Sequence, residues 1–106
     1  MDRCNFNLIV VGPGNWDPID DNIDVEVRFD DGRIYTATFF TIKNLETLFL
    51  KNEVTGECGS GLYLWAAEMI IVKRLSLDVL NATVEHLLRE NEFDSTFTRV
   101  FSDRIK

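Results

Sequence analysis

Apolar and charged residues alternate from Ile23 to Asp30, which predicts the first strand of a β-hairpin. Four apolar side chains take every second position, the period of a strand with one buried face. The following segment, Arg33–Phe40, is rich in aromatic and β-branched residues and predicts the returning strand. Asp30–Gly32 lies between them and predicts a turn, because glycine adopts a positive φ without strain.

The length of this turn decides which side chains of the hairpin share a face. A two-residue loop would pair Phe29 with Ile34, whereas a three-residue loop with a bulge at Gly32 pairs Phe29 with Arg33. We expect the bulged loop, because it makes the more apolar face from the same residues. That register places Tyr35, Ala37 and Phe39 opposite Val27, Val25 and Ile23.

Other short apolar runs predict the remaining strands. Phe6–Val11 ends in a continuous apolar run, so we expect it to be a central strand of the sheet. Leu62–Trp65 and Met69–Val72 predict two short strands, or a single bent one. We expect Trp65 to lie in the core.

Two segments show helical spacing. The first is capped by Thr41 or Asn44 and ends at Gly56. The second begins after Ser76 and ends near Asn91. Their expected buried stripes are Ile42, Leu45, Leu48 and Phe49 in the first, and Leu77, Leu80, Val84, Leu87 and Leu88 in the second. Residues 93–106 contain further aromatic residues and predict a docked tail.

The order of these elements predicts an α+β fold. We expect a single domain over residues 1–106, with a mostly antiparallel sheet of four to five strands and two helices on one face. Hydrophobic residues make up 45% of the chain and charged residues 27%, a globular composition. The apolar runs are far shorter than the roughly 20 residues of a membrane span, and Leu8–Val11 is too short for a secretory signal. A cytoplasmic protein is therefore expected.

The negative charge is concentrated at the start of the chain. Residues 1–31 hold eight acids against two bases, which accounts for −6 of the net charge of −7. Such a chain offers no cluster of cations for nucleic acid, whereas a basic protein would be attracted to it. A merely solubilising surface is the alternative. The expected partner-binding residues are Trp16, Asp17, Asp20, Asp21 and Asp24.

Trp16 stands in a polar loop that is rich in acids. It is either an anchor that packs the loop onto the domain or an interface residue, a role in which tryptophan is enriched. The acids around it do not form a calcium loop, because the position that needs glycine is Val25. No metal site is predicted.

Few residues suggest catalysis, and neither a catalytic residue nor a cofactor is predicted. The glycines of residues 12–14 and 56–61 lack the other residues of a nucleotide-binding loop. His86 is the only histidine, and we expect it to be exposed. Cys4 and Cys58 are expected to be free thiols rather than a disulfide, and the acidic surroundings of Cys58 favour an inert thiol.

Four stretches of the chain carry a resemblance to known proteins. They are Ala37–Thr41, Asn44–Leu48, Thr55–Cys58 and Tyr63–Val72. They resemble a group of short, uncharacterised bacterial proteins, and the chain is similar in character to immunity proteins of polymorphic toxin systems, which are often small, acidic and α+β. The resemblance implies a binding protein and assigns no site residues.

Two hypotheses follow from the sequence. The first is a non-enzymatic bacterial binding protein, in its most specific form an immunity protein that neutralises a basic toxin through an acidic surface. The alternative is a small enzyme that uses carboxylates such as Glu68 together with Cys58. A binding protein should present its contact residues on an open surface, whereas an enzyme should gather Glu68 and Cys58 in one pocket.

Overall fold

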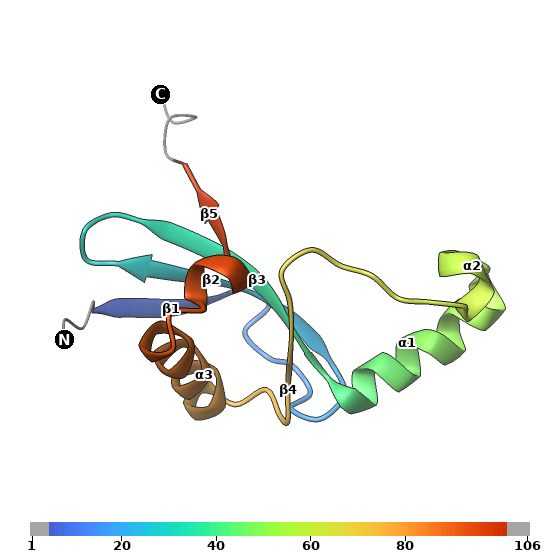
Figure 1. Cartoon of the computed structure of the whole chain (residues 1–106). Coiled ribbons are helices and arrows are strands. Elements are labelled where there is room, and N and C mark those ends of the chain that lie inside the picture. Colours follow the sequence, from blue (N-terminus) through green and yellow to red (C-terminus); the bar gives the residue numbers. More distant parts are fainter. Residues whose placement is uncertain (1–4, 102–106) are drawn as a thin grey trace.

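A computed structural model describes residues 5–101 of the 106-residue chain as an α+β fold. Its sheet has five strands: β1 (Phe6–Val11), β2 (Asn22–Phe29), β3 (Ile34–Thr41), β4 (Met69–Val72) and β5 (Thr98–Val100). Its helices are α1 (Ile42–Thr55), α2 (Glu57–Gly61), α3 (Leu77–Arg89) and α4 (Phe93–Thr96). The strand order is β1-β2-β3-β4, and β5 also pairs with β3 (Figure 1). All pairings are antiparallel except that of β3 with β4. The predicted fold class is confirmed.

The β2–β3 hairpin has the bulged register that the sequence favours. The backbone N–H of Phe29 donates to Arg33 O at 2.9 Å, and that of Gly32 donates to Phe29 O at 3.0 Å. Gly32 has a φ of +96°, which a residue with a side chain would adopt only under strain. Val27 therefore pairs with Tyr35, and all the residues on the predicted apolar face are buried.

The prediction that Phe6–Val11 is a central strand is wrong. β1 lies at one edge of the sheet, where it pairs with β2. Its residues alternate between half-buried and exposed rather than being buried on both faces. Ile9 and Val11 lie on the face of the sheet that α3 does not cover, so a continuous apolar run does not require a central position here.

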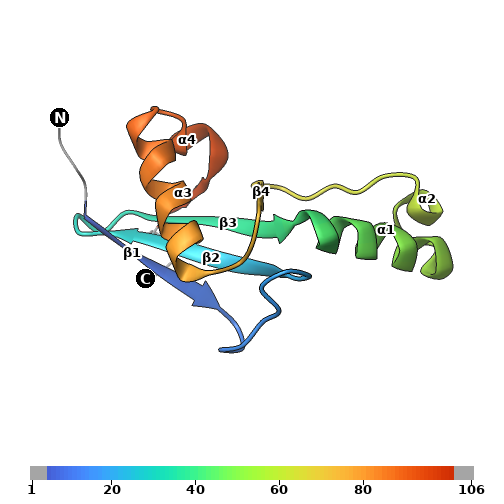
Figure 2. The ribbon, with the colours of Figure 1, turned by 90° about the horizontal axis from the view of Figure 1, so that it is seen from below.

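The core lies between the sheet and the two helices α3 and α4 (Figure 2). Leu80 and Val84 of α3 are fully buried, as predicted, whereas Leu77 is 54% exposed and was wrongly assigned to the buried stripe. The tail docks through Phe93, whose ring stacks on that of Phe97 with 4.4 Å between centroids. The docked tail is confirmed for residues 93–100, whereas Phe101 is 62% exposed, and residues 102–106 lie outside the described part.

The helix predicted after the hairpin forms, but it does not cover the sheet. Thr41 is its N-cap, accepting a hydrogen bond from the backbone N–H of Asn44 at 3.1 Å, and Gly56 ends it with a φ of +89°. α1 continues along the direction of β3 and projects beyond the sheet (Figures 1 and 2). The radius of gyration is 15.2 Å, against about 13 Å for a compact chain of this length.

The segment after α1 also departs from its prediction. α2 is a single turn in which Cys58, Gly59 and Ser60 all have positive φ values, so the glycine-rich connector is a tight turn. Leu62–Trp65 forms no strand, whereas Met69–Val72 forms β4. Residues 42–68 together make a projection that we call the arm. None of the helices in residues 5–101 is long and apolar enough to cross a membrane.

Candidate protein-interaction surface

Trp16 anchors the β1–β2 loop to the body of the protein. Its indole N–H donates to Leu75 O at 2.6 Å, and the half-buried ring packs against the core. The backbone N–H of Leu75 in turn donates to Pro18 O at 2.8 Å. Of the two roles considered for Trp16, the geometry gives it that of a loop anchor.

The carboxylates of Asp17 and Asp21 hold the shape of this loop. Asp17 accepts hydrogen bonds from the backbone N–H groups of Ile19 and Asp20 at 2.9 and 3.2 Å. Asp21 accepts one from the backbone N–H of Asp17 at 3.0 Å. These contacts are those of local turns that aspartate commonly stabilises, so the cluster of acids has a structural role whether or not a partner binds it.

Asp20 fixes the loop to the first two turns of α1. One carboxylate oxygen accepts from Thr47 Oγ1 at 2.9 Å and the other from Asn44 Nδ2 at 3.2 Å. Thr41 Oγ1 donates to Ile19 O at 2.5 Å, and Asn22 Nδ2 donates to Asn44 Oδ1 at 2.9 Å. The acidic loop therefore lies beside the base of the arm.

Asp24 is separated from the other predicted site residues. Because side chains alternate along β2, it lies on the face of the sheet opposite α3, where Thr38 Oγ1 donates to it at 2.8 Å. There it lines a hollow of about 330 Å³ that also contains Glu26 and Glu68. The structure thus groups Asp17, Asp20 and Asp21 in the loop and places Asp24 on the sheet.

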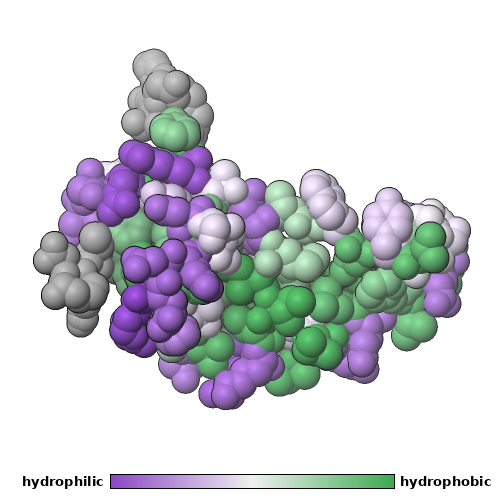
Figure 3. Space-filling model, viewed as in Figure 1, coloured by the Kyte–Doolittle hydropathy of each residue, from purple (hydrophilic) through white to green (hydrophobic). Residues whose placement is uncertain are grey.

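The arm carries an apolar surface that the sequence analysis missed. Among residues 5–101, twelve large apolar side chains are exposed, and seven of them come from residues 42–71. Six of the seven lie on the arm and one lies on the adjoining β4. We call them together the arm surface: Ile42, Leu50, Val54, Leu62, Tyr63, Trp65 and Ile71. Figure 3 shows apolar residues gathered over β4 and along α1 on one side of the molecule. Single exposed apolar residues are ordinary, but several of them on one projecting segment are typical of an interaction site.

Two signals in the sequence could have revealed this surface. Leu50 and Val54 are four residues apart and lie on the side of α1 away from the predicted stripe, so the helix is apolar on two sides. Trp65 follows a glycine-rich turn in a short run without strand alternation. It is 75% exposed, so its assignment to the core is wrong.

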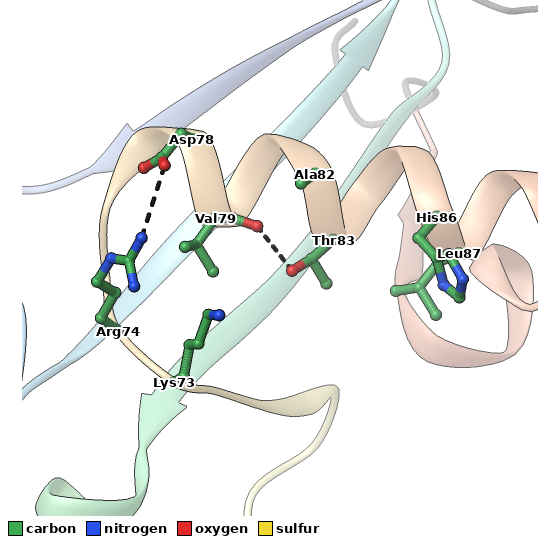
Figure 4. A pocket seen from close by; sticks show the side chains of 8 residues that line it. All are labelled: Lys73, Arg74, Asp78, Val79, Ala82, Thr83, His86 and Leu87. Atoms are coloured by element: carbon green, nitrogen blue, oxygen red, sulfur yellow. Dashed lines mark hydrogen bonds and ion pairs between the residues drawn. The ribbon is translucent and has the colours of Figure 1, made fainter.

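A shallow hollow lies beside α3. It has a volume of about 510 Å³ between α3 and the segment that follows β4, and it is lined by Lys73, Arg74 and His86 among others (Figure 4). Arg74 is paired with Asp78 at 3.8 Å, and exposed His86 lies 3.9 Å from Glu90. Val79, Ala82 and Leu87 line the rest with Thr83, whose hydroxyl donates to Val79 O at 2.7 Å. The lining offers no nucleophile next to a base, as acyl transfer would need.

Cys58 and Glu68 are not brought together. Cys58 is a half-buried free thiol on α2 at the end of the arm, whereas Glu68 precedes β4 beside the sheet (Figure 1). Glu68 accepts a hydrogen bond from Thr98 Oγ1 at 2.7 Å. Within residues 5–101 the geometry therefore provides no joint site for these two groups. Cys4, the other cysteine, lies outside the described residues.

Comparison with known proteins adds no relative: no family model, curated protein or solved structure matches the chain.

Proposed function

We propose that the chain is a non-enzymatic protein-binding protein whose arm docks onto an apolar patch of its partner. The observation that carries this proposal is the arm surface, with Val54 87% and Leu62 80% exposed at the end that projects furthest from the core. Burial of apolar surface drives most protein association, and a few residues, often tryptophan or tyrosine, dominate the binding energy. Trp65 and Tyr63 are residues of the type that act as such anchors.

The expected partner is basic. Asp17, Asp20 and Asp21 lie in the loop at the base of the arm, where they form an acidic border to an apolar contact area. Protein interfaces commonly combine an apolar centre with a polar rim, and complementary charge on the rim speeds association. In this proposal Trp16 holds the acidic loop in position, and Asp24 lies outside the main contact.

The most specific form of the proposal is a bacterial immunity protein that neutralises a basic toxin. Its support is the resemblance in size, acidity and α+β character, together with an exposed surface suited to occluding another protein. We place such a protein in the cytoplasm, where it would meet the toxin inside the cell that produces it.

The test is capture of a partner by tagged wild-type chain and by an arm variant. In Leu50→Lys/Val54→Lys, two ammonium groups interrupt the arm surface at positions that are 63% and 87% exposed, so the fold should be unaffected. Leu77→Lys is the control, because it adds one lysine at a 54% exposed position on α3, outside the arm.

We expect wild type and Leu77→Lys to retain the same basic protein from extracts of the producing cell. The arm variant should lose at least about tenfold in affinity for it, the loss typical of disrupting an interface anchor. Circular dichroism of each variant checks that the fold is retained. A partner that binds the arm variant as tightly as wild type would overturn the proposal.

A further inference from the structure

β1 presents an unprotected edge of the sheet. Within residues 5–101 it pairs with β2 alone, through six consecutive residue pairs without a bulge. Its sequence, Phe-Asn-Leu-Ile-Val-Val, contains no charged residue and no proline. Natural sheets usually protect such edges with lysine, proline, bulges or a covering segment, because an open edge can pair with another strand.

The backbone groups of alternate β1 residues point outward from the sheet. The N–H of Asp30 donates to Asn5 O at 3.1 Å, which marks this pair as hydrogen-bonded. Because hydrogen-bonded and non-hydrogen-bonded pairs alternate in an antiparallel ladder, Asn7 and Ile9 also direct their backbone groups towards β2. Phe6, Leu8 and Val10 therefore direct theirs to the free edge.

The core is incompletely closed at the same edge. The side chains of Phe6, Leu8 and Val10 face the core side of the sheet and are half-buried. Their partners on β2 are Phe29, Val27 and Val25, which are 5%, 0% and 1% exposed. A further strand along β1 would thus bury apolar surface and satisfy backbone groups together.

We propose that β1 pairs antiparallel with β1 of a second copy of the chain, so that the two sheets become continuous. A two-fold axis through Leu8 places Leu8 opposite Leu8 and Phe6 opposite Val10. Phe6, Leu8 and Val10 of one copy then each pair with a residue of the other copy whose backbone groups also point to the free edge. Each such pair can exchange two N–H···O=C bonds. Paired side chains lie on the same face, so the core sides of the two copies join.

The absence of charge on β1 makes this edge better suited to a second copy of the uncharged strand than to a basic partner. β1 is uncharged, so the join brings no like charges directly opposite one another and offers no carboxylate to a cation. The copies still repel at longer range, since each carries −7. Salt should therefore strengthen this self-association by screening the repulsion, whereas it should weaken binding of a basic partner to the acidic loop.

Sedimentation of the full chain over a range of concentrations, at low and at high salt, tests the proposal. Ile9→Lys places a charge on the sheet face at a 37% exposed position of β1, and the two new ammonium groups lie diagonally across the axis. Ile19→Lys makes the same change at a 55% exposed loop position, and Val54→Lys alters the arm surface. Circular dichroism establishes that each variant folds.

We expect wild type, Ile19→Lys and Val54→Lys to dimerise more tightly at high salt. Ile9→Lys should lower the dimer association constant at least about tenfold, because like charges face each other across the join. A wild type that stays monomeric at every concentration overturns the proposal, as does an Ile9→Lys chain that dimerises like wild type. Loss of the dimer in Val54→Lys would also overturn it, by placing the contact on the arm instead; the function proposed for the arm is tested separately by partner capture.

Discussion

At the scale of single residues, Trp16 links segments that are far apart in the chain. Its indole N–H reaches a carbonyl oxygen 59 residues away, in the segment between β4 and α3. The side chain thereby closes the loop against the core and fixes where the acids lie. In the proposed function, Trp16 contributes to binding by holding the acidic loop.

Replacement of Trp16 should act by lowering the stability of the fold rather than by removing a direct contact with a partner. We expect Trp16→Ala to reduce the free energy of unfolding by about 2–4 kcal/mol, because a half-buried ring and a hydrogen bond are lost. Trp16→Phe keeps most of the packing and should cost about 1 kcal/mol, the usual net value of one hydrogen bond. Urea denaturation measures both values. Equal stability of wild type and Trp16→Ala would show that the ring is not an anchor.

Asp31 makes the hairpin turn sensitive to acid. The backbone N–H of Arg33 donates to its carboxylate at 3.1 Å, and this bond, with the neighbouring guanidinium, lowers the pKa of Asp31 below its model-compound value of 3.8. A carboxyl whose pKa is lowered by folding stabilises the fold above its unfolded-state pKa, and this contribution is lost as pH falls through the folded-state pKa.

The melting temperature of wild type should therefore fall more than that of Asp31→Asn as the pH is lowered through and below about 4. The difference should be small, because the Asp31 side chain is exposed and its ion pair with Arg33 is screened by water. Thermal denaturation at a series of pH values between neutral and acidic measures it. Parallel curves for the two chains would contradict the assigned turn contact.

At the scale of elements, α3 shows how one helix serves both the core and the surface. Leu80 is fully buried, whereas Leu77, one turn earlier, is 54% exposed. The sequence pattern could not separate them, because both are leucines at spacings compatible with one apolar stripe.

These two leucines provide a matched test of how α3 is placed. We expect Leu80→Ala to cost about 2–5 kcal/mol, the range for a buried leucine that leaves a cavity. Leu77→Ala should change stability by less than about 0.5 kcal/mol, as is usual for exposed positions. Chemical denaturation of both variants measures the two changes. Similar losses from both would mean that α3 is rotated from the orientation described.

Elements marked by alternation or by capping residues could be predicted from the sequence, whereas apolar content alone was not sufficient. The hairpin register could be predicted because, of the two turn lengths that Gly32 allows, the bulged one makes the more apolar face. The C-terminal end of α1 could be predicted from Gly56, whereas its start remained open between Thr41 and Asn44, of which Thr41 is the N-cap. The position of α1 relative to the sheet could not be predicted. An amphipathic pattern indicates that one face of a helix will be covered, but it does not identify the covering element. The run Leu62–Trp65 was misjudged because apolar content alone does not distinguish a strand from an exposed contact segment.

At the scale of the whole molecule, an apolar surface on the arm and an acidic loop lie at the same end of the sheet. β3 leads directly into α1, so the arm extends from the sheet, and the β1–β2 loop brings its acids to the base of the arm (Figure 1). An apolar surface beside a negative field suits a partner that is steered by charge and held by apolar contacts.

Charge and apolar contact should therefore affect different steps of binding. Replacing Asp17, Asp20 and Asp21 by Asn should mainly slow association with a basic partner, and added salt should slow association of wild type in the same way. Leu50→Ala/Val54→Ala, which removes apolar contact without changing charge, should mainly speed dissociation. Surface plasmon resonance with the captured partner separates the two rates. Unchanged association of the triple Asn variant at low and high salt would identify the acids as a solubilising surface only.

The most direct test of the arm as the contact surface is amide hydrogen exchange of the chain with and without its captured partner. Binding should slow exchange in residues 42–68, where docking covers the exposed segments of the arm, while amides of α3 keep their rates. Slower exchange confined to α3 or to the β1 edge, with the arm unchanged, would contradict the proposal that this protein binds its partner through the arm.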